Sequence, residues 1–230
     1  MEGWRLRGQL AQPPVAWRRE RWTEYFPGHQ VAFRRAPDLL DRVSLRHACE
    51  GAAADAASAA NAFILVMAWG YGTEVGYGPW RTLRVLSGTD RAAQKLAAVA
   101  ETLGTHGALP AYARLGDDGD CRLRWLGPAF GTKFMYFCQP AHQNTTALVL
   151  DSLVAAWLRR KTDLHLNPAA WSVSTYGRYL QQMHLWASWL ECTADQLEYC
   201  IFREMSIERK SQWGKSHTSG AMSHRRLHRY

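Results

Sequence analysis

The sequence predicts an all-α protein. Apolar residues recur at intervals of three and four in successive segments, the spacing that places them on one face of a helix. Several of these segments follow a residue able to cap a helix, and no two neighbouring segments show the alternating pattern of a strand hairpin. The chain has 230 residues, of which 47% are hydrophobic, so it can bury a sizeable core. We therefore expect helices packed in layers.

The first 55 residues are expected to form an arm and one helix that pack on the body. Arginine and tryptophan are frequent there, prolines interrupt the arm, and a helix is predicted from Pro37 to about Cys49. Residues 56–208 are expected to form the helical core. The helix predicted at its start, Asp55 to Trp69, is alanine-rich and then strongly apolar, which is typical of a central buried helix.

Glycines alternate with aromatic residues in the segment WGYGTEVGYGPWR, residues 69–81. We expect a long irregular loop here. Glycine lets a backbone pass close to a ligand, and aromatic faces can hold an unstacked base. The alternative is that the aromatic side chains pack inward. The segment is not a dinucleotide-binding fingerprint, because no strand precedes it.

Two further helices are predicted, one from Asp90 to Leu103 after a cap at Ser87 or Thr89, and one around Ala108 to Leu115. Three acids follow within residues 116–120, but the closing glutamate of a calcium loop is missing at the required offset. We interpret this segment as a turn and expect no metal site. The five cysteines form no Cys-x-x-Cys pair and indicate neither a disulfide framework nor a zinc or iron–sulfur site. No cofactor is expected.

A helical hairpin is predicted at residues 121–139. Its first helix would be Cys121 to Leu126, with Arg122 and Arg124 available to bind phosphate. A tight turn rich in small residues follows, and the second helix is expected to open with Thr132-Lys133. Backbone N–H groups at a helix start have no partner inside the helix, and the positive end of the helix dipole also favours an anion. The turn is therefore a candidate phosphate site.

A lysine and a carboxylate are predicted at the starts of two successive helices. Lys133 would lie in the first turn of the second hairpin helix. The apolar run Ala147 to Leu150 leads to Asp151, a good N-cap for a helix from Leu153 to Arg160. Taken alone, each residue has an ordinary interpretation, as an exposed lysine and as a helix cap. Their combination after this turn predicts a catalytic pair.

Two long helices are predicted after this pair. One begins at Asn167-Pro168 and carries an apolar stripe at three- and four-residue spacing from Tyr176 to Leu190. The other begins with a capping box, Thr193 and Gln196, and ends near Glu208.

The formal net charge of +8 is concentrated in a basic C-terminal tail, residues 209–230, which carries six Lys/Arg and no acid. Such a tail favours nucleic acid without reading its sequence, although it can equally be a solubilising tail. No apolar run approaches the roughly 18 residues of a membrane span, and the first ten residues lack the apolar core of a signal peptide. We therefore expect a cytoplasmic protein that does not associate with membranes.

Gly131-Thr132-Lys133 after a Leu-Gly-Pro turn, followed by the hydrophobic approach to Asp151, resembles the helix-hairpin-helix DNA glycosylase superfamily. Within this superfamily the chain most resembles the branch that has a lysine, the 8-oxoguanine DNA glycosylases, and in particular its bacterial members. Residues 194–202 are similar to the closing helix of those bacterial members. The resemblance covers roughly residues 61–204. The sequence departs from the family in having Ala129 where a second glycine is usual, and Leu148-Val149-Leu150 where many members have a Gly/Pro pair.

The resemblance implies the helix-hairpin-helix glycosylase fold and a role for each candidate residue. Lys133 would be the nucleophile and Asp151 the assisting aspartate. The phosphates beside the damaged base would be bound by Arg122 and Arg124 and by the backbone at Gly127, Ala129, Gly131 and Thr132. The pocket for the extruded base would include Trp69, Tyr71 and Phe137. The implied partner is double-stranded DNA with a modified base in a bacterial nucleoid, and no obligate protein partner is inferred.

A lysine of this kind attacks the anomeric carbon of the sugar as a neutral amine, displaces the base and leaves a Schiff base that can break the strand. The resemblance implies oxidised guanine as the first candidate substrate. One alternative is an anti-phage defence glycosylase specific for glucosylated hydroxymethylcytosine, for which the Gly-rich loop would leave room. Another is a non-catalytic DNA-binding module that only grips the backbone. An RNA-binding protein has less support, because no RNP-type strand motif is present.

Overall fold

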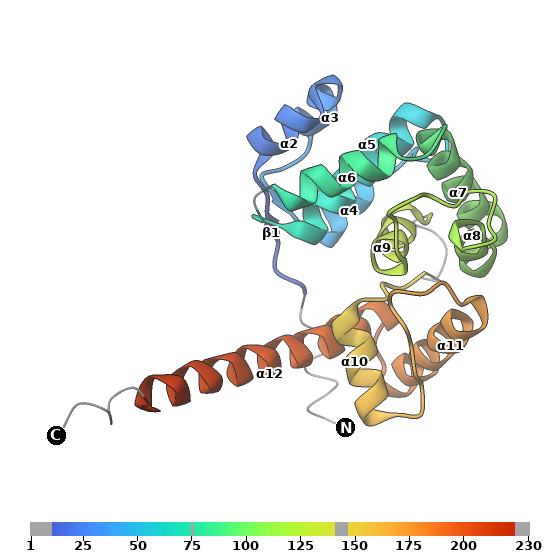
Figure 1. Ribbon diagram of the computed structural model, residues 1–230. Helices are drawn as coiled ribbons and strands as arrows, with labels where there is room; N and C mark the ends of the chain where they lie inside the picture. Colours follow the sequence, from blue (N-terminus) through green and yellow to red (C-terminus); the bar gives the residue numbers. More distant parts are fainter. Residues whose placement is uncertain (1–10, 75, 141–146, 224–230) are drawn as a thin grey trace.

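The computed structural model describes residues 11–74, 76–140 and 147–223, the last of these with the backbone alone at 210 and 212–223. It is almost entirely helical, which confirms the all-α prediction (Figure 1). The elements are β1 (Val15–Ala16), α2 (Arg19–Tyr25), η1 (Pro27–His29), α3 (Gln30–Arg35), β2 (Leu39–Leu40), α4 (Arg42–Ala48), α5 (Ala56–Tyr71), α6 (Tyr77–Ser87), α7 (Ala92–His106), α8 (Ala108–Leu115), α9 (Pro128–Cys138), α10 (Ser152–Lys161), α11 (Val173–Leu190) and α12 (Ala194–Ser223).

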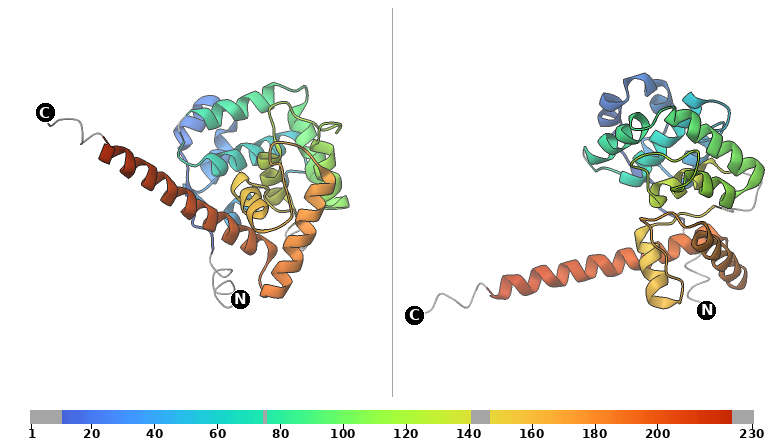
Figure 2. Two further views of the ribbon diagram at one scale, coloured as in Figure 1. Left: turned by 60° about the horizontal axis from the view of Figure 1, so that its bottom comes forward. Right: turned by 45° about the vertical axis from the view of Figure 1, so that its right-hand side comes forward.

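The helices form two groups, which are separate in Figure 1 and in the right-hand view of Figure 2. The larger group contains α2 to α9, and the smaller contains α10, α11 and the start of α12. Helix α9 lies at the border, packing on α5, α7 and α8 from the larger group while facing the smaller one. Any residue on the outward side of α9 is therefore positioned to meet the second group.

Helix α5 is the centre of the larger group, as its composition predicted. Every residue from Ala62 to Trp69 is buried, and the helix packs against α6, α7 and α9. Asp55 caps its start by accepting a hydrogen bond from the Ser58 N–H at 2.8 Å. The capping aspartate fixes where the helix begins, and the apolar run places it in the core.

The N-terminal arm contains more structure than the sequence indicated. Its strand β1 pairs antiparallel with β2, so Leu39–Leu40 is extended and the helix predicted from Pro37 begins only at Arg42. Asp41 caps that helix, accepting hydrogen bonds from the Val43 and Ser44 N–H groups. The pairing with a distant strand is a tertiary contact, which local helix signals do not contain.

The expected long loop at 69–81 was wrong. Helix α5 continues to Tyr71 and α6 begins at Tyr77, so the connection is only residues 72–76. Glu74 holds the start of α6 by accepting hydrogen bonds from the N–H groups of Tyr77 and Gly78. Gly78 is needed for close packing, since a Cβ there would lie 2.8 Å from the Tyr71 ring. Glycine here serves packing between helices rather than an open loop.

The helix predicted at Cys121–Leu126 is also absent, and these residues form turns between α8 and α9. The Arg114 guanidinium binds the Asp120 carboxylate, and the Cys121 N–H donates to the Arg114 carbonyl at 3.0 Å. These bonds draw the chain back onto the end of α8. A short segment tethered in this way cannot also form a helix.

The remaining boundaries differ in smaller ways. Helix α7 starts at Ala92, because the hydroxyl of Thr89, a predicted cap, accepts the Arg124 N–H instead. At its other end the helix continues past the predicted end at Leu103, through Gly104, to His106. Helix α11 starts at Val173, after the capping residue Ser172. Helix α12 runs to Ser223, beyond the predicted end at Glu208; the last residues of the basic tail, 224–230, lie outside the described part of the chain.

Within the described residues, no helix combines the length and the apolar character that crossing a bilayer requires.

The Arg114–Asp120 pair predicts a pH-dependent contribution to stability. Hydrogen bonds from Arg114 lower the pKa of Asp120 to about 2. The folded protein therefore holds the ionised form more tightly than the unfolded chain, so the contribution is present above pH 4 and disappears as the pH falls to about 2. We expect Asp120→Asn to lower the free energy of unfolding at pH 7 by less than about 1 kcal/mol, because the carboxylate is largely exposed. Urea denaturation at pH 7 and near pH 2 measures this difference.

Asp118→Asn is the matched control, since Asp118 is exposed and makes no ion pair within the described chain. An equal effect of the two substitutions at pH 7, or an Asp120→Asn effect that persists near pH 2, would contradict the assignment.

Candidate active site

The structure brings the predicted lysine and aspartate into contact. Lys133 Nζ lies 3.1 Å from Asp151 Oδ2, and the two side chains are 9% and 20% exposed. The amine also donates to the Ala129 carbonyl at 3.3 Å and lies 5.0 Å from the centre of the Phe130 ring. Taking two charges out of water is costly, so a buried pair is a weak device for stability alone.

The sequence predicted Lys133 in the first turn of its helix, but the structure places it further along. Helix α9 begins at Pro128 with Gly127 as its N-cap, which makes Lys133 the sixth residue. The hairpin turn was expected to continue to Gly131, but proline is well suited to a first helical position and the helix starts there instead. The dipole at the helix start therefore acts on the turn and not directly on the lysine.

This earlier start also reduces the expected set of phosphate-binding N–H groups. Gly131 donates its N–H to the Gly127 carbonyl at 3.0 Å, and Thr132 lies one residue further inside the helix. Among the hydrogen bonds of the described residues, none uses the N–H of Gly127 or Ala129. These two groups remain as candidate donors to an anion.

Gly131 has a packing role instead. A Cβ at this position would lie 2.5 Å from the Trp171 ring, so only glycine allows the segment before α11 to cover α9. Gly70 acts similarly from α5, since its Cβ would lie 2.6 Å from the Phe130 ring and 3.5 Å from Lys133 Cδ. Two glycines thus let the neighbouring elements close around the lysine side chain.

Asp151 is delivered by an extended segment, Ala147–Leu150, that is completely buried. Buried peptide groups need hydrogen-bond partners, and here side chains supply them. The Gln139 amide bonds both the N–H and the carbonyl of Ala147, the Tyr176 hydroxyl bonds both groups of Leu148, and the Tyr179 hydroxyl donates to the Val149 carbonyl. Side chains of α11 and of Gln139, the residue after α9, therefore replace a neighbouring strand.

The last bond of this segment sets the register of the pair. Thr132 Oγ1 accepts the Leu150 N–H at 2.9 Å and donates to the Pro128 carbonyl at 2.8 Å. Thr132 precedes Lys133 and Leu150 precedes Asp151, so the hydroxyl aligns the two backbones one residue before the pair. Asp151 then uses its two oxygens separately: Oδ1 caps α10 by accepting the Leu153 N–H at 2.9 Å, and Oδ2 accepts from the lysine.

A cavity of about 310 Å³ opens onto the pair. Trp69 and Tyr71 line it, as expected for the base pocket, together with Gly70 from the same helix. Phe137 does not line it, because that side chain is buried behind Trp69 with ring centres 4.9 Å apart. The other lining residues come from five separate parts of the chain: Gln12, Val15, Arg42, Gly72, Val149, Glu198 and Phe202, besides the pair itself.

The cavity wall holds a second ion pair, which the sequence did not predict. Glu198 is 2% exposed, and its Oε2 accepts from Arg42 Nη2 at 2.6 Å. Burial raises the pKa of Glu198, while the Arg42 guanidinium acts in the opposite direction. Gln12 completes the set by accepting from Arg42 Nε at 2.8 Å. The only signal in the sequence is a glutamate placed among the apolar residues of the closing helix.

The two arginines predicted for the DNA backbone lie beside the turn before α9. Arg122 pairs with Asp117 at 3.2 Å, and Arg124 lies 5.2 Å from the centre of the Trp125 ring. Both line a hollow of about 550 Å³ that also includes Gly127. The structure thus brings the predicted phosphate-binding arginines and one of the two free N–H groups to a single place.

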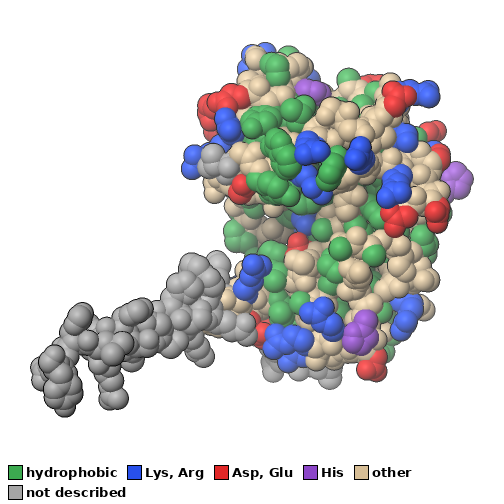
Figure 3. Space-filling view, viewed as in Figure 1, with side chains coloured by type: hydrophobic (Ala, Val, Ile, Leu, Met, Phe, Trp, Pro, Cys, Tyr) green, Lys and Arg blue, Asp and Glu red, His purple; other side chains and the backbone are tan. Residues whose placement is uncertain are grey.

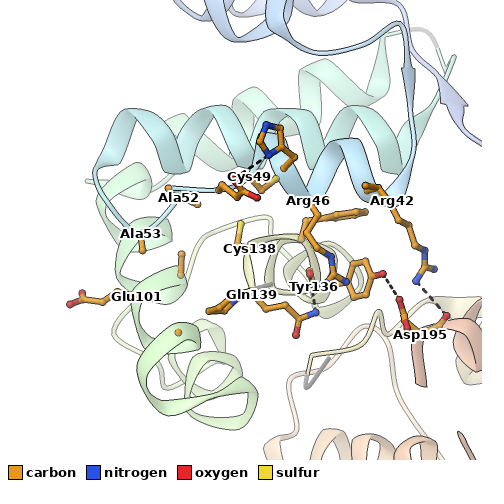
Figure 4. A pocket seen from close by; sticks show the side chains of 18 of the residues that line it. Arg42, Arg46, Cys49, Ala52, Ala53, Glu101, Tyr136, Cys138, Gln139 and Asp195 are labelled. Carbon is orange, nitrogen blue, oxygen red and sulfur yellow. Dashed lines mark hydrogen bonds and ion pairs between the residues drawn. The ribbon is translucent and has the colours of Figure 1, made fainter. Parts of the chain in front are cut away.

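A larger cavity, of about 960 Å³, lies between α4, α7, α9 and the start of α12, and it contains neither Lys133 nor Asp151 (Figure 4). Its polar end is formed by Tyr136, whose hydroxyl donates to Asp195 at 2.8 Å with Arg42 and Arg46 against its ring. Size alone favours this cavity. We assign the candidate site to the smaller one because it contains the buried amine and carboxylate that chemistry requires.

The Thr132 hydroxyl should be tested directly. Thr132→Val leaves the buried Leu150 N–H without an acceptor, so we expect the free energy of unfolding to fall by about 1–3 kcal/mol. The same change should loosen the alignment of Lys133 with Asp151. Urea denaturation gives the first quantity.

Thr132→Ser is the matched control, because it keeps the hydroxyl and removes only a methyl group. If serine and valine variants lost the same stability, packing of the methyl rather than the hydrogen bond would hold the segment.

A family model with the description "Putative 8-oxoguanine DNA glycosylase OGG-like protein" matches residues 8–202 of the chain. No curated protein and no solved structure matches it.

Proposed function

Since the chain belongs to this OGG-like DNA glycosylase family, we propose that it excises an oxidised guanine from DNA, with Lys133 as the nucleophile and Asp151 as the assisting carboxylate. The observation that carries the proposal is the buried contact of 3.1 Å between the two side chains at the wall of a cavity. A base released from the stack can enter such a cavity, where its sugar would meet the amine.

The pair can carry out both proton transfer and attack. Proton transfer from the ammonium to Asp151 Oδ2 leaves a neutral amine with a free electron pair. That pair forms a bond to the anomeric carbon while the bond from this carbon to the base breaks, and the base leaves with the bonding electrons and takes up a proton. The attached nitrogen then carries two protons and loses one of them. The electron pair that this frees forms a double bond to the anomeric carbon while the bond from this carbon to the ring oxygen breaks, and the ring oxygen takes up a proton. The product is a protonated Schiff base, which either is hydrolysed by water or undergoes an elimination that cuts the strand.

The environment of the amine supports this role over simple DNA binding. A module that only binds the DNA backbone would use an exposed lysine, because the phosphates lie in water at the surface of the duplex. Lys133 is instead largely buried, and its carboxylate partner would weaken any attraction to phosphate. A non-catalytic module therefore has no use for this arrangement.

The chemistry of the pocket favours a guanine ring. The Watson–Crick edge of guanine presents N–H donors, including the exocyclic amino group. Glu198 offers a buried carboxylate on the cavity wall, and Trp69, Tyr71 and Phe202 offer apolar ring surface. A cavity of about 310 Å³ is also at the small end for ligand sites. The long loop that would have made room for a glucosylated base is replaced by the short 72–76 connection.

Borohydride trapping tests the proposal. Incubation with a duplex carrying 8-oxoguanine should give a covalent adduct with the wild-type chain and none with Lys133→Gln, because glutamine cannot form a Schiff base. Lys161→Gln, an exposed lysine in α10, is the control and should trap as the wild type does. A parallel duplex containing glucosylated hydroxymethylcytosine should remain intact.

Three outcomes would contradict parts of this proposal. Base release without any adduct would make water, activated at Asp151, the nucleophile. Cleavage of the glucosylated base alone would replace the substrate. Retained DNA binding with neither base released would identify a non-catalytic module.

Asp151→Asn should separate the catalytic role of the carboxylate from its structural role. Asparagine is also a preferred N-cap, so α10 should still form, while the proton acceptor and its charge are lost. We expect the single-turnover rate of base release to fall about 10²–10⁴-fold. Asp55→Asn, which replaces the cap of α5 in the same way, should leave the rate unchanged. An equal loss in both variants would assign the effect to helix capping.

A further inference from the structure

Exposed and half-buried aromatic and arginine side chains gather on α6 and on the turn before α9. The aromatic members are Tyr77, Trp80 and Trp125, which are 51%, 39% and 38% exposed. We call these three, together with Arg81, Arg84 and Arg124, the aromatic–arginine surface. Figure 3 shows hydrophobic and Lys/Arg side chains mixed over the region where α6 lies in Figure 1.

The three guanidinium groups converge on one ring. Arg81, Arg84 and Arg124 lie 5.6, 4.2 and 5.2 Å from the centre of the Trp125 ring, and Arg84 also lies 5.1 Å from that of Trp80. Within the described chain, none of the three forms an ion pair with a carboxylate. Like charges held this close repel one another, so an anion placed among them would be bound favourably.

The backbone at Trp125 is held in an unfavourable conformation. Its φ of 72° lies in the left-handed region that residues with a side chain seldom adopt. Gly88 makes room for the ring, because a Cβ there would lie 3.2 Å from it. Strain that is maintained by surrounding packing is a feature of binding sites. Here it presents the Trp125 ring to the arginines.

The surface is continuous with the candidate active site through ring contacts. Trp80 contacts Tyr77 at 5.5 Å between ring centres, Tyr77 contacts Tyr71 at 5.9 Å, and Tyr71 stacks on Phe130 at 4.7 Å. Phe130 in turn lies beneath the Lys133 amine. A row of aromatic rings therefore leads from Lys133 to the three arginines.

We propose that the aromatic–arginine surface binds an unpaired stretch of the DNA strand whose base enters the pocket. In a duplex the faces of the bases are covered by their neighbours, so exposed rings find nothing to stack on. An unpaired strand offers base faces to Tyr77 and Trp80 and phosphates to the arginines, the combination used by proteins that bind single strands. The inference rests on the proposed function only for the identity of that strand. It implies that the protein binds single-stranded DNA at least as tightly as duplex DNA.

Binding of unmodified oligonucleotides tests the inference without requiring catalysis. The probe is a fluorescently labelled oligothymidylate, compared with a labelled hairpin duplex, and affinity is measured by anisotropy over a range of salt concentrations. The full chain carrying Lys133→Gln is used throughout, so that no base is released during the measurement.

Trp80→Ala should weaken binding of the single strand about ten-fold and that of the duplex much less, while Trp80→Phe should retain most of the affinity. Arg84→Gln should reduce the slope of log affinity against log salt for the single strand by about 0.7, the value expected for one lost phosphate contact. Trp189→Ala, which removes a tryptophan 60% exposed on α11, is the matched control and should bind as the parent does.

Equal binding of the single strand by Trp80→Ala and Trp189→Ala would overturn the inference, as would an equal loss of duplex affinity in Trp80→Ala. If Trp80→Ala fails to fold, the salt slope of Arg84→Gln decides instead, since Arg84 lies on the surface. Failure of the proposed function would appear as absent base release with these binding differences intact. Failure of the inference would leave Lys133-dependent trapping on duplex DNA unchanged.

Discussion

The candidate site depends on a buried extended segment whose peptide groups are hydrogen-bonded by side chains. Among the described residues no strand pairs with Ala147–Leu150, yet this segment crosses the interior between the two groups of helices. Gln139, Thr132 and the tyrosines of α11 supply the partners that burial demands. Because these side chains are themselves buried and fixed, they determine where the segment ends, and Asp151 follows directly from that end.

Charge balance is the second constraint on the cavity. Its wall holds two cations and two carboxylates, arranged as the pairs Lys133–Asp151 and Arg42–Glu198. Their nearness is evident at Glu198, where Asp151 raises the pKa and Lys133 lowers it, both less strongly than burial and Arg42 act. A neutral set of four charges can be buried where one or three could not. The Arg42–Glu198 pair thus allows a carboxylate to face the cavity.

The placement of the cavity between the two groups of helices explains why so many elements contribute to it. Lys133 comes from α9, and Trp69 and Tyr71 come from α5. Asp151 and Glu198 come from the second group. The N-terminal arm adds Gln12 and Val15 along one edge. Tyr71 links this cavity to the outer face of α6, because its ring contacts both Phe130 and Tyr77. The candidate active site and the surface proposed to bind the DNA strand are therefore connected by aromatic rings.

The sequence by itself determined the all-α class and the central helix α5, and it singled out Lys133 and Asp151 as candidates. The helices and the cap at Asp151 follow from local signals, namely apolar periodicity, a capping aspartate and the apolar run before it, which act over a few residues. Lys133 was selected by the turn before it and by the family resemblance. Only the tertiary structure decided that α9 begins at Pro128, that Phe137 lies behind Trp69 and that Glu198 faces the pocket. Each of these depends on contacts between residues far apart in the chain, whose energies no local pattern records.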